Sequence, residues 1–319
     1  MGLVFHNGKF MPEDHIQKAS EEAEVLRLLR SFLDANEPSL VRFLVNTWNA
    51  QGKAITYKQL REAILAGEID AEILDDWMQD YTRFVTKYME PAWEKAMAAA
   101  AVDMERKYPG WFFDPAGDGV RAWTESHAAE FVTNVTQSQI DGIQAVVRRA
   151  AVLEDMSVDQ LSRVIRPMVG LTQQQSVANL RYYNSLIENG VSTERAKDLS
   201  IRYSARQHRY RGYNIARTEL AFAYNQGIYE GTRQAQAEGY LGEVVKVWCT
   251  ADDERVCPIC GGLEGKTVAM DDDFDFYTKL ASRNETIRKV PPAHPSCRCG
   301  VLIKQVRPPI YQNNKMSNQ

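Results

Sequence analysis

The chain has 319 residues, of which 44% are hydrophobic and 25% are charged, a composition that excludes a fibrous or wholly disordered protein. A net charge of −4 excludes a protein that covers nucleic acid with its whole surface, although it allows a local basic patch. The first ten residues lack the pattern of a signal peptide, and no apolar run approaches the roughly 20 residues that cross a bilayer. We therefore expect a protein made in a cytoplasm, without a membrane span.

Residues 1–110 are predicted to form a helical N-terminal region. Apolar residues recur at helical spacing over residues 21–33. Pro38 follows, and because proline disrupts a helix interior, we expect a separate helix over residues 40–48.

The second half of this region is also expected to be helical. Thr56 is suited to capping the next helix, and Gly67 is suited to ending it. A long helical pattern covers residues 69–101, and Pro91 is expected to kink or divide it.

Residues 111–240 are predicted to form a central helical region. A loop rich in proline and glycine, residues 108–119, marks the boundary before it. Ser157 and Ser192 are candidate caps for the helices that they precede. The last of these helices is long and basic.

Arginines are repeated along this basic helix, most of them three or four residues apart on one face. The candidates for contact with DNA or with an acidic partner protein are Arg202, Arg206, Arg209, Arg211 and Arg217. The alternative is a solvated helix face with ion pairs to Glu194, Asp198 or a neighbouring helix.

The pattern changes in residues 241–306, where two short strands are predicted over 244–248 and 301–306. Residues 307–319 form a polar, proline-containing tail, which we expect to be flexible. The predicted fold class is therefore mainly α, with helical N-terminal and central regions and a small α+β C-terminal module.

All five cysteines follow residue 248, and an odd, clustered set without an export signal favours metal binding over disulfides. Cys257 and Cys260 are separated by two residues, so both thiolates can reach one ion from a tight turn. His294 and Cys297 repeat this gap. The spacing predicts a structural zinc site that staples a module too small to build its own core.

Five residues compete for the four positions of a zinc tetrahedron. We favour Cys257, Cys260, His294 and Cys297, with Cys299 replacing Cys297 if the turn is tighter. Cys249 is expected to be a spare thiol on the first strand. The alternatives are unligated buried thiols, or a catalytic zinc with an open position and a nearby general base.

Several separate motifs occur in this chain in the same order as in a known family. They are Ala216 to Glu219, Ala223, Asn225, Gly227, Trp248, Asp252 to Arg255, Cys257 and Cys260, Leu263 to Gly265, and Pro291 to Cys299. Together they resemble the C-terminal half of Mu-like head morphogenesis proteins, the minor head proteins of tailed bacteriophages. The resemblance covers roughly residues 160–306.

This resemblance implies a virion component present in few copies, assembled in the host cytoplasm and located in the phage head. Its implied partner is the portal protein, with the major capsid or scaffold protein and double-stranded DNA as further candidates. Some relatives appear to leave the head with the DNA. Others carry fused toxin-like catalytic domains, and we expect no such domain here. Because Arg217 and Glu219 lie inside the family motif, they are expected to make buried or interhelical polar contacts and not catalytic ones.

Two other classes of function remain as alternatives. A zinc-stapled nuclease needs a catalytic histidine beyond the metal ligand, and the other histidines, His6, His15, His127 and His208, lie far upstream. A zinc-dependent DNA-binding regulator needs base-contacting residues on a short helix beside the metal, and the sequence offers no clear candidate. We therefore expect a structural protein and not an enzyme.

Overall fold

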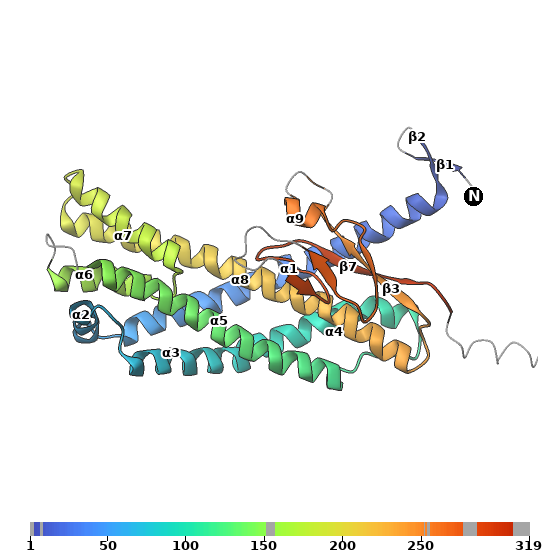
Figure 1. The fold of residues 1–319 in the computed structure, drawn as a ribbon, viewed down its shortest axis with the longest axis horizontal. Coiled ribbons are helices and arrows are strands. Elements are labelled where there is room, and N and C mark those ends of the chain that lie inside the picture. The colour runs from blue at the N-terminus through green and yellow to red at the C-terminus, as the bar shows by residue number, and fades with distance from the viewer. Residues whose placement is uncertain are drawn as a thin grey trace, which may run out of the picture. The chain divides into compact units, whose positions relative to one another are not determined.

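The computed structural model describes residues 3–6, 9–150, 157–251, 253, 256–276 and 286–308 (Figure 1). The fold is mainly helical with small sheets, as predicted. The helices are α1 (Glu13–Ala54), α2 (Tyr57–Ala66), α3 (Ala71–Phe84), α4 (Glu90–Lys107), α5 (Asp118–Ala150), α6 (Val158–Ile165), α7 (Gln173–Glu188), α8 (Thr193–Ala237) and α9 (Pro258–Gly261). The strands are β1 (Leu3–His6), β2 (Lys9–Pro12), β3 (Val244–Cys249), β4 (Thr267–Ala269), β5 (Phe274–Phe276), β6 (Thr286–Arg288) and β7 (Gly300–Gln305).

The chain forms two compact units, each built from segments that are far apart in the sequence. Unit 1 contains residues 1–37, 92–122 and 217–319. Unit 2 contains residues 38–91 and 123–216. The division into consecutive domains, 1–110, 111–240, 241–306 and 307–319, stays a prediction. Residues 309–319 of the expected flexible tail lie outside the described part of the chain.

Unit 2 is an all-helical body in the described residues. Its core contains apolar side chains of α2, α3, α5, α6 and α7, including Leu60, Trp77 and Ile143. A second buried group joins Trp48 to Tyr81: the indole Nε1 donates to the Tyr81 hydroxyl at 2.7 Å, and that hydroxyl donates to Gln139 Oε1 at 2.5 Å. These bonds satisfy polar atoms that would otherwise be costly to bury.

Unit 1 holds the sheets. The largest one has the strand order β4-β3-β7, and both pairings are antiparallel (Figure 1). On one face of this sheet, Val247 and Leu302 pack against Val25 and Leu26 of α1. The end of α8 that lies in unit 1 contributes Tyr229, whose ring contacts the Lys246 side chain of β3 at 5.1 Å. The sheet therefore packs against helices of unit 1.

Most of the expected local signals are confirmed. Thr56 and Ser157 each form a capping box with the residue three positions on, and Gly67 ends α2 with a φ of 75°. A π-helical turn, Val85–Met89, divides the long helix just before Pro91. Proline lacks a backbone N–H and its ring clashes with the preceding turn, which accounts for this break.

The prediction that the helix divides at Pro38 is wrong. α1 continues through Pro38 as one helix from Glu13 to Ala54. Packing along both sides of the proline accounts for this, because Leu29, Leu33, Leu40 and Leu44 are all buried. Tertiary burial thus outweighs the local cost of the proline.

None of the helices, searched over the described residues, is both long enough and apolar enough to span a membrane.

Candidate metal centre and the helix that anchors it

The first half of the candidate metal centre is the short helix α9. Cys257 stands at its N-cap position, and the backbone N–H of Cys260 points at the Cys257 sulfur at 3.4 Å. Pro258 at the first helical position fixes the entry into this turn. Both sulfurs are thereby presented from one side of a single turn, as their spacing predicts.

The second half is a turn directly before β7. The backbone N–H of Cys297 donates to the His294 carbonyl at 3.1 Å, so the two residues lie at the ends of a tight turn. The Nδ1 of His294 lies 2.9 Å from the Pro295 carbonyl, which leaves Nε2 to face the sulfurs. Cys299 follows just before the first residue of β7.

The two halves converge on one point. His294 Nε2 lies 3.1 Å from the sulfur of Cys257 and 3.2 Å from that of Cys260. The Cys260 and Cys297 sulfurs are 3.6 Å apart. A tetrahedral zinc with Zn–S bonds of about 2.3 Å places its sulfurs roughly 3.7 Å apart, so this donor set fits the ion.

Five donors are available, because the ligand atoms form two overlapping groups that share Cys260. Cys257, Cys260 and His294 make one group, and Cys260, Cys297 and Cys299 make the other. Within each group the atoms lie within 4.8 Å of one another. Cys260, Cys297 and Cys299 are buried, and the other two ligands are partly exposed.

The charge of this cluster follows from its closely spaced sulfurs. Hydrogen bonds from Cys260 and Cys299 hold the pKa of the Cys297 thiol well below its usual range. Burial alone would lower the pKa of His294, but the Pro295 carbonyl and the sulfurs of Cys297 and Cys257 raise it. Hydrogen bonds with Cys297 and Cys299 raise the pKa of Cys260, so the thiols compete for protons that a bound cation would displace.

Cys249 does not share in the cluster. Its side chain is fully buried on β3, where it packs with Val247 and Leu302. Burial, with Glu22 next in weight, raises the pKa of this thiol to about 12. Cys249 is a protonated apolar side chain, in agreement with the expectation of a spare thiol on the strand.

The turn before β7 is tied to α8 by two polar residues whose role was not predicted from the sequence. The Asn225 side chain accepts from the Val301 backbone N–H at 2.9 Å and donates to the Cys299 carbonyl at 3.3 Å. The Thr218 hydroxyl accepts from the Ser296 backbone N–H at 2.8 Å. A fully buried asparagine in an alanine-rich helix is the signal that could have indicated this role.

Two ion pairs brace unit 1. Arg298, between the two closing cysteines, makes a two-pronged pair with Asp253 at 2.6 and 2.7 Å. Arg217 makes a similar pair with Glu37 of α1 at 2.7 and 3.2 Å, and the Glu37 side chain is 2% exposed. The expected interhelical contact of Arg217 is present. Of the family's expected turn from Asp252 to Arg255, only Asp253 lies within the described part of the chain.

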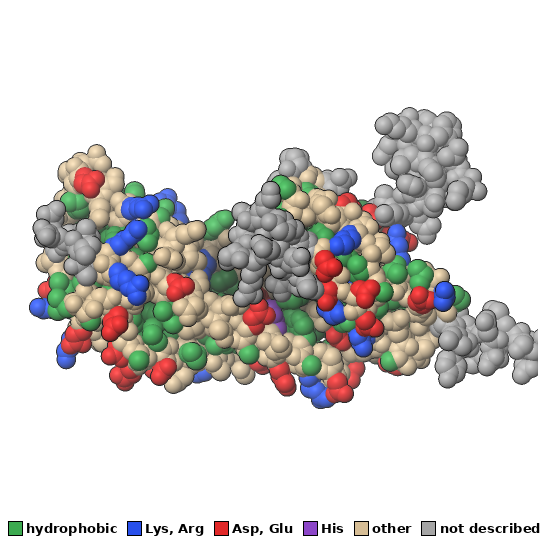
Figure 2. Space-filling view, in the orientation of Figure 1, with side chains coloured by type: hydrophobic (Ala, Val, Ile, Leu, Met, Phe, Trp, Pro, Cys, Tyr) green, Lys and Arg blue, Asp and Glu red, His purple; other side chains and the backbone are tan. Residues whose placement is uncertain are grey.

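Three of the five candidate arginines lie on an exposed face of α8 in unit 2. Arg202, Arg206 and Arg209 are exposed, as are Tyr210 and Tyr213 beside them. Within the described part of the chain, none of the three has a carboxylate within 4.0 Å. Figure 2 shows lysine and arginine side chains gathered over the end of unit 2 that holds α6 and α7.

Arg211 lies inside unit 2. Its side chain is 5% exposed, donates to the Gly170 carbonyl, and sits over the Trp48 ring at 5.2 Å. His208 is also buried and donates from Nε2 to the Val169 carbonyl at 2.8 Å. Arg211 is therefore separate from the exposed arginines. Because its side chain is buried, it is not accessible for the contact with DNA or a partner protein that was predicted from the sequence.

Residues 179–302 match the family model described as Phage Mu protein F like protein. The matched range runs from α7 through the anchoring helix α8 and the turns that hold the candidate metal ligands into β7. This match confirms the family resemblance expected from the C-terminal motifs. Among curated proteins and among solved structures, no match to the chain was found.

Proposed function

We propose, from the match of residues 179–302 to Phage Mu protein F like proteins, that this chain is a minor component of a phage head. The observation that carries the proposal is that the matched motif residues form one connected structure. Asn225 and Thr218 of α8 bind the turn that presents the candidate metal ligands. The motif thus corresponds to a physical unit, which makes a chance match of scattered residues a poor explanation.

The portal protein is the proposed partner within the head, with the major capsid and scaffold proteins as alternatives. We propose a low copy number, and assembly in the host cytoplasm before packaging. The test is quantitative mass spectrometry of purified heads before and after triggered DNA release. A few copies per full head support the proposal, and a fall after release adds ejection with the genome. Absence from heads would overturn it.

The metal centre is proposed to be structural zinc held by Cys257, Cys260, His294 and Cys297, with Cys299 as the alternative fourth ligand. The donor set supports this role because four protein ligands complete the tetrahedron and leave no open position for substrate. Three of the sulfurs are buried, which also suits a closed site. When bound, the ion would supply the cross-link between α9 and the turn before β7.

We propose no enzymatic activity. The buried histidine of α8, His208, is bonded to the Val169 carbonyl, and the ring of His127 stacks on Trp123 at a centroid distance of 4.5 Å. Both histidines thus have structural contacts of their own, while the side chains of His6 and His15 lie outside the described part. A nuclease assay with Mg²⁺ or Mn²⁺ tests this point, and metal-dependent cleavage would favour the nuclease alternative.

The exposed arginine face of α8 is proposed to contact packaged DNA. Arg202, Arg206 and Arg209 are accessible and lack carboxylate partners in the described residues, and exposed tyrosines accompany them. Glu194, the expected partner in the ion-pair alternative, pairs instead with Lys197. Guanidinium groups without carboxylate partners on one helix face suit phosphate contacts, and that of Arg206 also lies over the Tyr203 ring at 5.7 Å.

Salt dependence tests this contact. Each neutralised phosphate contributes about 0.9 to the slope of log affinity against log salt. Replacing the three arginines with glutamine should therefore reduce the slope by about 2 to 3 and weaken binding to a DNA duplex. Arg148 and Arg149 of α5, which are exposed, provide the matched control when replaced in the same way. Equal slopes for the two variants would leave the arginines without a DNA role.

A further inference from the structure

Strand β7 has one unpaired edge. The sheet order is β4-β3-β7, so within the described residues β7 pairs with β3 on one side and with no strand on the other. An unpaired edge exposes backbone donors and acceptors, which another strand can bind.

The register fixes which groups face the open side. The Trp248 N–H donates to the Lys266 carbonyl and its C=O accepts from the Gly265 N–H, just before β4, so the neighbouring Val247 and Cys249 bond toward β7. Their partners in β7 are Leu302 and Gly300. Because bonding direction alternates along an antiparallel strand, the N–H and C=O groups of Val301, Ile303 and Gln305 point away from β3.

The first part of this open edge is already occupied. The Asn225 side chain accepts from the Val301 N–H and donates to the Cys299 carbonyl. Both backbone groups therefore point away from β3, as the register requires. Asn225 thus occupies the place of a neighbouring strand for one residue pair. The backbone groups of Ile303 and Gln305 have no hydrogen-bond partner in the described part of the chain.

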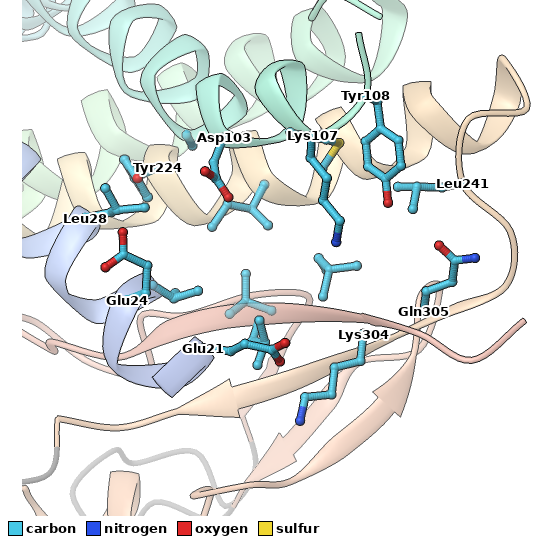
Figure 3. Close-up of a pocket in the computed structure, with 17 residues that line it drawn as sticks. Glu21, Glu24, Leu28, Asp103, Lys107, Tyr108, Tyr224, Leu241, Lys304 and Gln305 are labelled. Carbon is cyan, nitrogen blue, oxygen red and sulfur yellow. The ribbon is translucent and has the colours of Figure 1, made fainter. Parts of the chain in front are cut away.

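This edge opens into a cavity of about 680 Å³ that lies wholly within unit 1 (Figure 3). All five residues from Val301 to Gln305 line it, and α1, α4 and α8 supply the other walls. Apolar side chains such as Leu28, Met104 and Ile228 cover much of its surface. A strand placed here would bury apolar side chains and satisfy the free backbone groups together.

The cavity has distinct charged ends. Glu21, Glu24 and Asp103 lie toward the α1 end, whereas Lys107 and Gln305 lie toward the other (Figure 3). Arg27 already pairs with Glu24 and Arg106 with Asp103, so Glu21 is the carboxylate at that end without an ion pair among the described residues. A basic side chain at that end of an entering strand complements Glu21.

The chain that follows β7 is led away from this edge. The N–H groups of Val306 and Arg307 both donate to the Glu243 carbonyl, at 2.8 and 3.2 Å, on the β3 side. The backbone of Arg307 and Pro308 also passes close to Gly242. These contacts direct residues 306–308 along β3 as the chain leaves the sheet, so this described segment does not fill the open edge.

We propose that the free edge of β7 binds an extended peptide segment of a partner protein by strand addition. The segment would pair with Ile303 and Gln305, place alternate apolar side chains in the cavity, and set a basic side chain against Glu21. This interaction depends on neither the zinc assignment nor the DNA contact.

The probe for this proposal is a fluorescent peptide of about eight residues, a usual strand length, which alternates valine with threonine or lysine. Two N-methylated versions form a matched pair. One is methylated at alternate residues and the other at the intervening ones, so in any one register only one version loses the N–H groups that face β7. Fluorescence anisotropy should show that one version binds about tenfold more weakly than the other, as expected for lost hydrogen bonds.

The protein variant is Ile303→Pro. Because the Ile303 N–H faces outward, proline removes a donor from the open edge without removing a bond to β3. Ile303→Val, which keeps the N–H, is the control. Peptide affinity should fall about tenfold in the proline variant and stay unchanged in the valine variant. The N-methylated pair keeps the test valid if the proline variant fails to fold.

Amide hydrogen exchange provides the direct readout. Ile303 and Gln305 should exchange quickly in the free protein, and both should become protected when the peptide is added. A peptide with glutamate in place of lysine should bind more weakly because of the carboxylates at the α1 end. Absent binding, equal binding by both N-methylated peptides, or unprotected Ile303 and Gln305 amides would each overturn the proposal.

Discussion

His208 and Arg211 of α8 hold the backbone turn at Val169 and Gly170 in the interior of unit 2. Gly170 has a φ of 90° and lies so close to the Trp48 side chain that a Cβ there would overlap it. The turn therefore depends on a glycine, a histidine and an arginine together. From the sequence, Arg211 was predicted to be one of the exposed contact arginines. Its buried position could not be read from local spacing, because the carbonyl that it binds belongs to a residue 41 positions away.

The burial of His208 predicts a pH-dependent stability. Burial, with the nearby Arg211 guanidinium as a further cause, lowers the pKa of His208 to about 4. An unfolded histidine titrates near 6.5, so between these values the unfolded chain binds a proton that the folded chain does not. Stability is thus fully present above pH 6.5 and is lost as the pH falls toward 4. The loss at pH 5 should be about 2 kcal/mol.

Urea unfolding at pH 7 and pH 5 measures this loss. His208→Gln removes the titration and keeps an N–H donor for the Val169 carbonyl. The wild type should lose about 2 kcal/mol more than the variant between the two pH values. Parallel losses would show that other groups carry the acid sensitivity.

At the scale of elements, α8 is the scaffold for both units, since its first part lies in unit 2 and its end in unit 1. This long helix and both main strands were predicted from the sequence, because arginine spacing and runs of strand-forming residues are local signals. The sequence also predicted that Cys257, Cys260, His294 and Cys297 lie together, because a two-residue gap lets both members of a pair face one point from a tight turn. The partners of Arg217 and Asn225 could not be predicted, since they lie 180 and 76 residues away.

The approach of α8 to α4 within unit 1 depends on Gly227. A Cβ at this position would lie 2.6 Å from the Met97 carbonyl oxygen, and the backbone cannot move aside as a flexible side chain could. Gly227→Ala should therefore destabilise the protein by about 1–3 kcal/mol. Chemical denaturation measures the change.

Gly231, one turn further along α8, is the control. A Cβ there meets only side chains at ordinary contact distances, the nearest at 3.4 Å from Trp111. Gly231→Ala should be neutral or stabilising by up to about 1 kcal/mol, because alanine favours a helix over glycine. Equal losses in the two variants would mean that helix approach at Gly227 is not the constraint.

For the whole molecule, the division into two units predicts how metal loss spreads. All the candidate zinc ligands and both of their anchors on α8 belong to unit 1. The core around Leu60, Leu161 and Ile165 belongs to unit 2 and has its own helical packing. Removing the metal should consequently loosen the sheet of unit 1 and leave the unit 2 core folded.

Cys260→Ser tests this, because Cys260 belongs to both groups of ligand atoms. Bound zinc should be lost, and hydrogen exchange should quicken in Val244–Cys249 and Gly300–Gln305 while the unit 2 core stays protected. Cys249→Ala is the control: it removes a buried thiol outside the cluster and should keep the zinc, at the cost of a small cavity. Unchanged zinc in Cys260→Ser would refute the assignment of this site. Equal loss of protection in both units would show instead that the zinc module supports the entire fold.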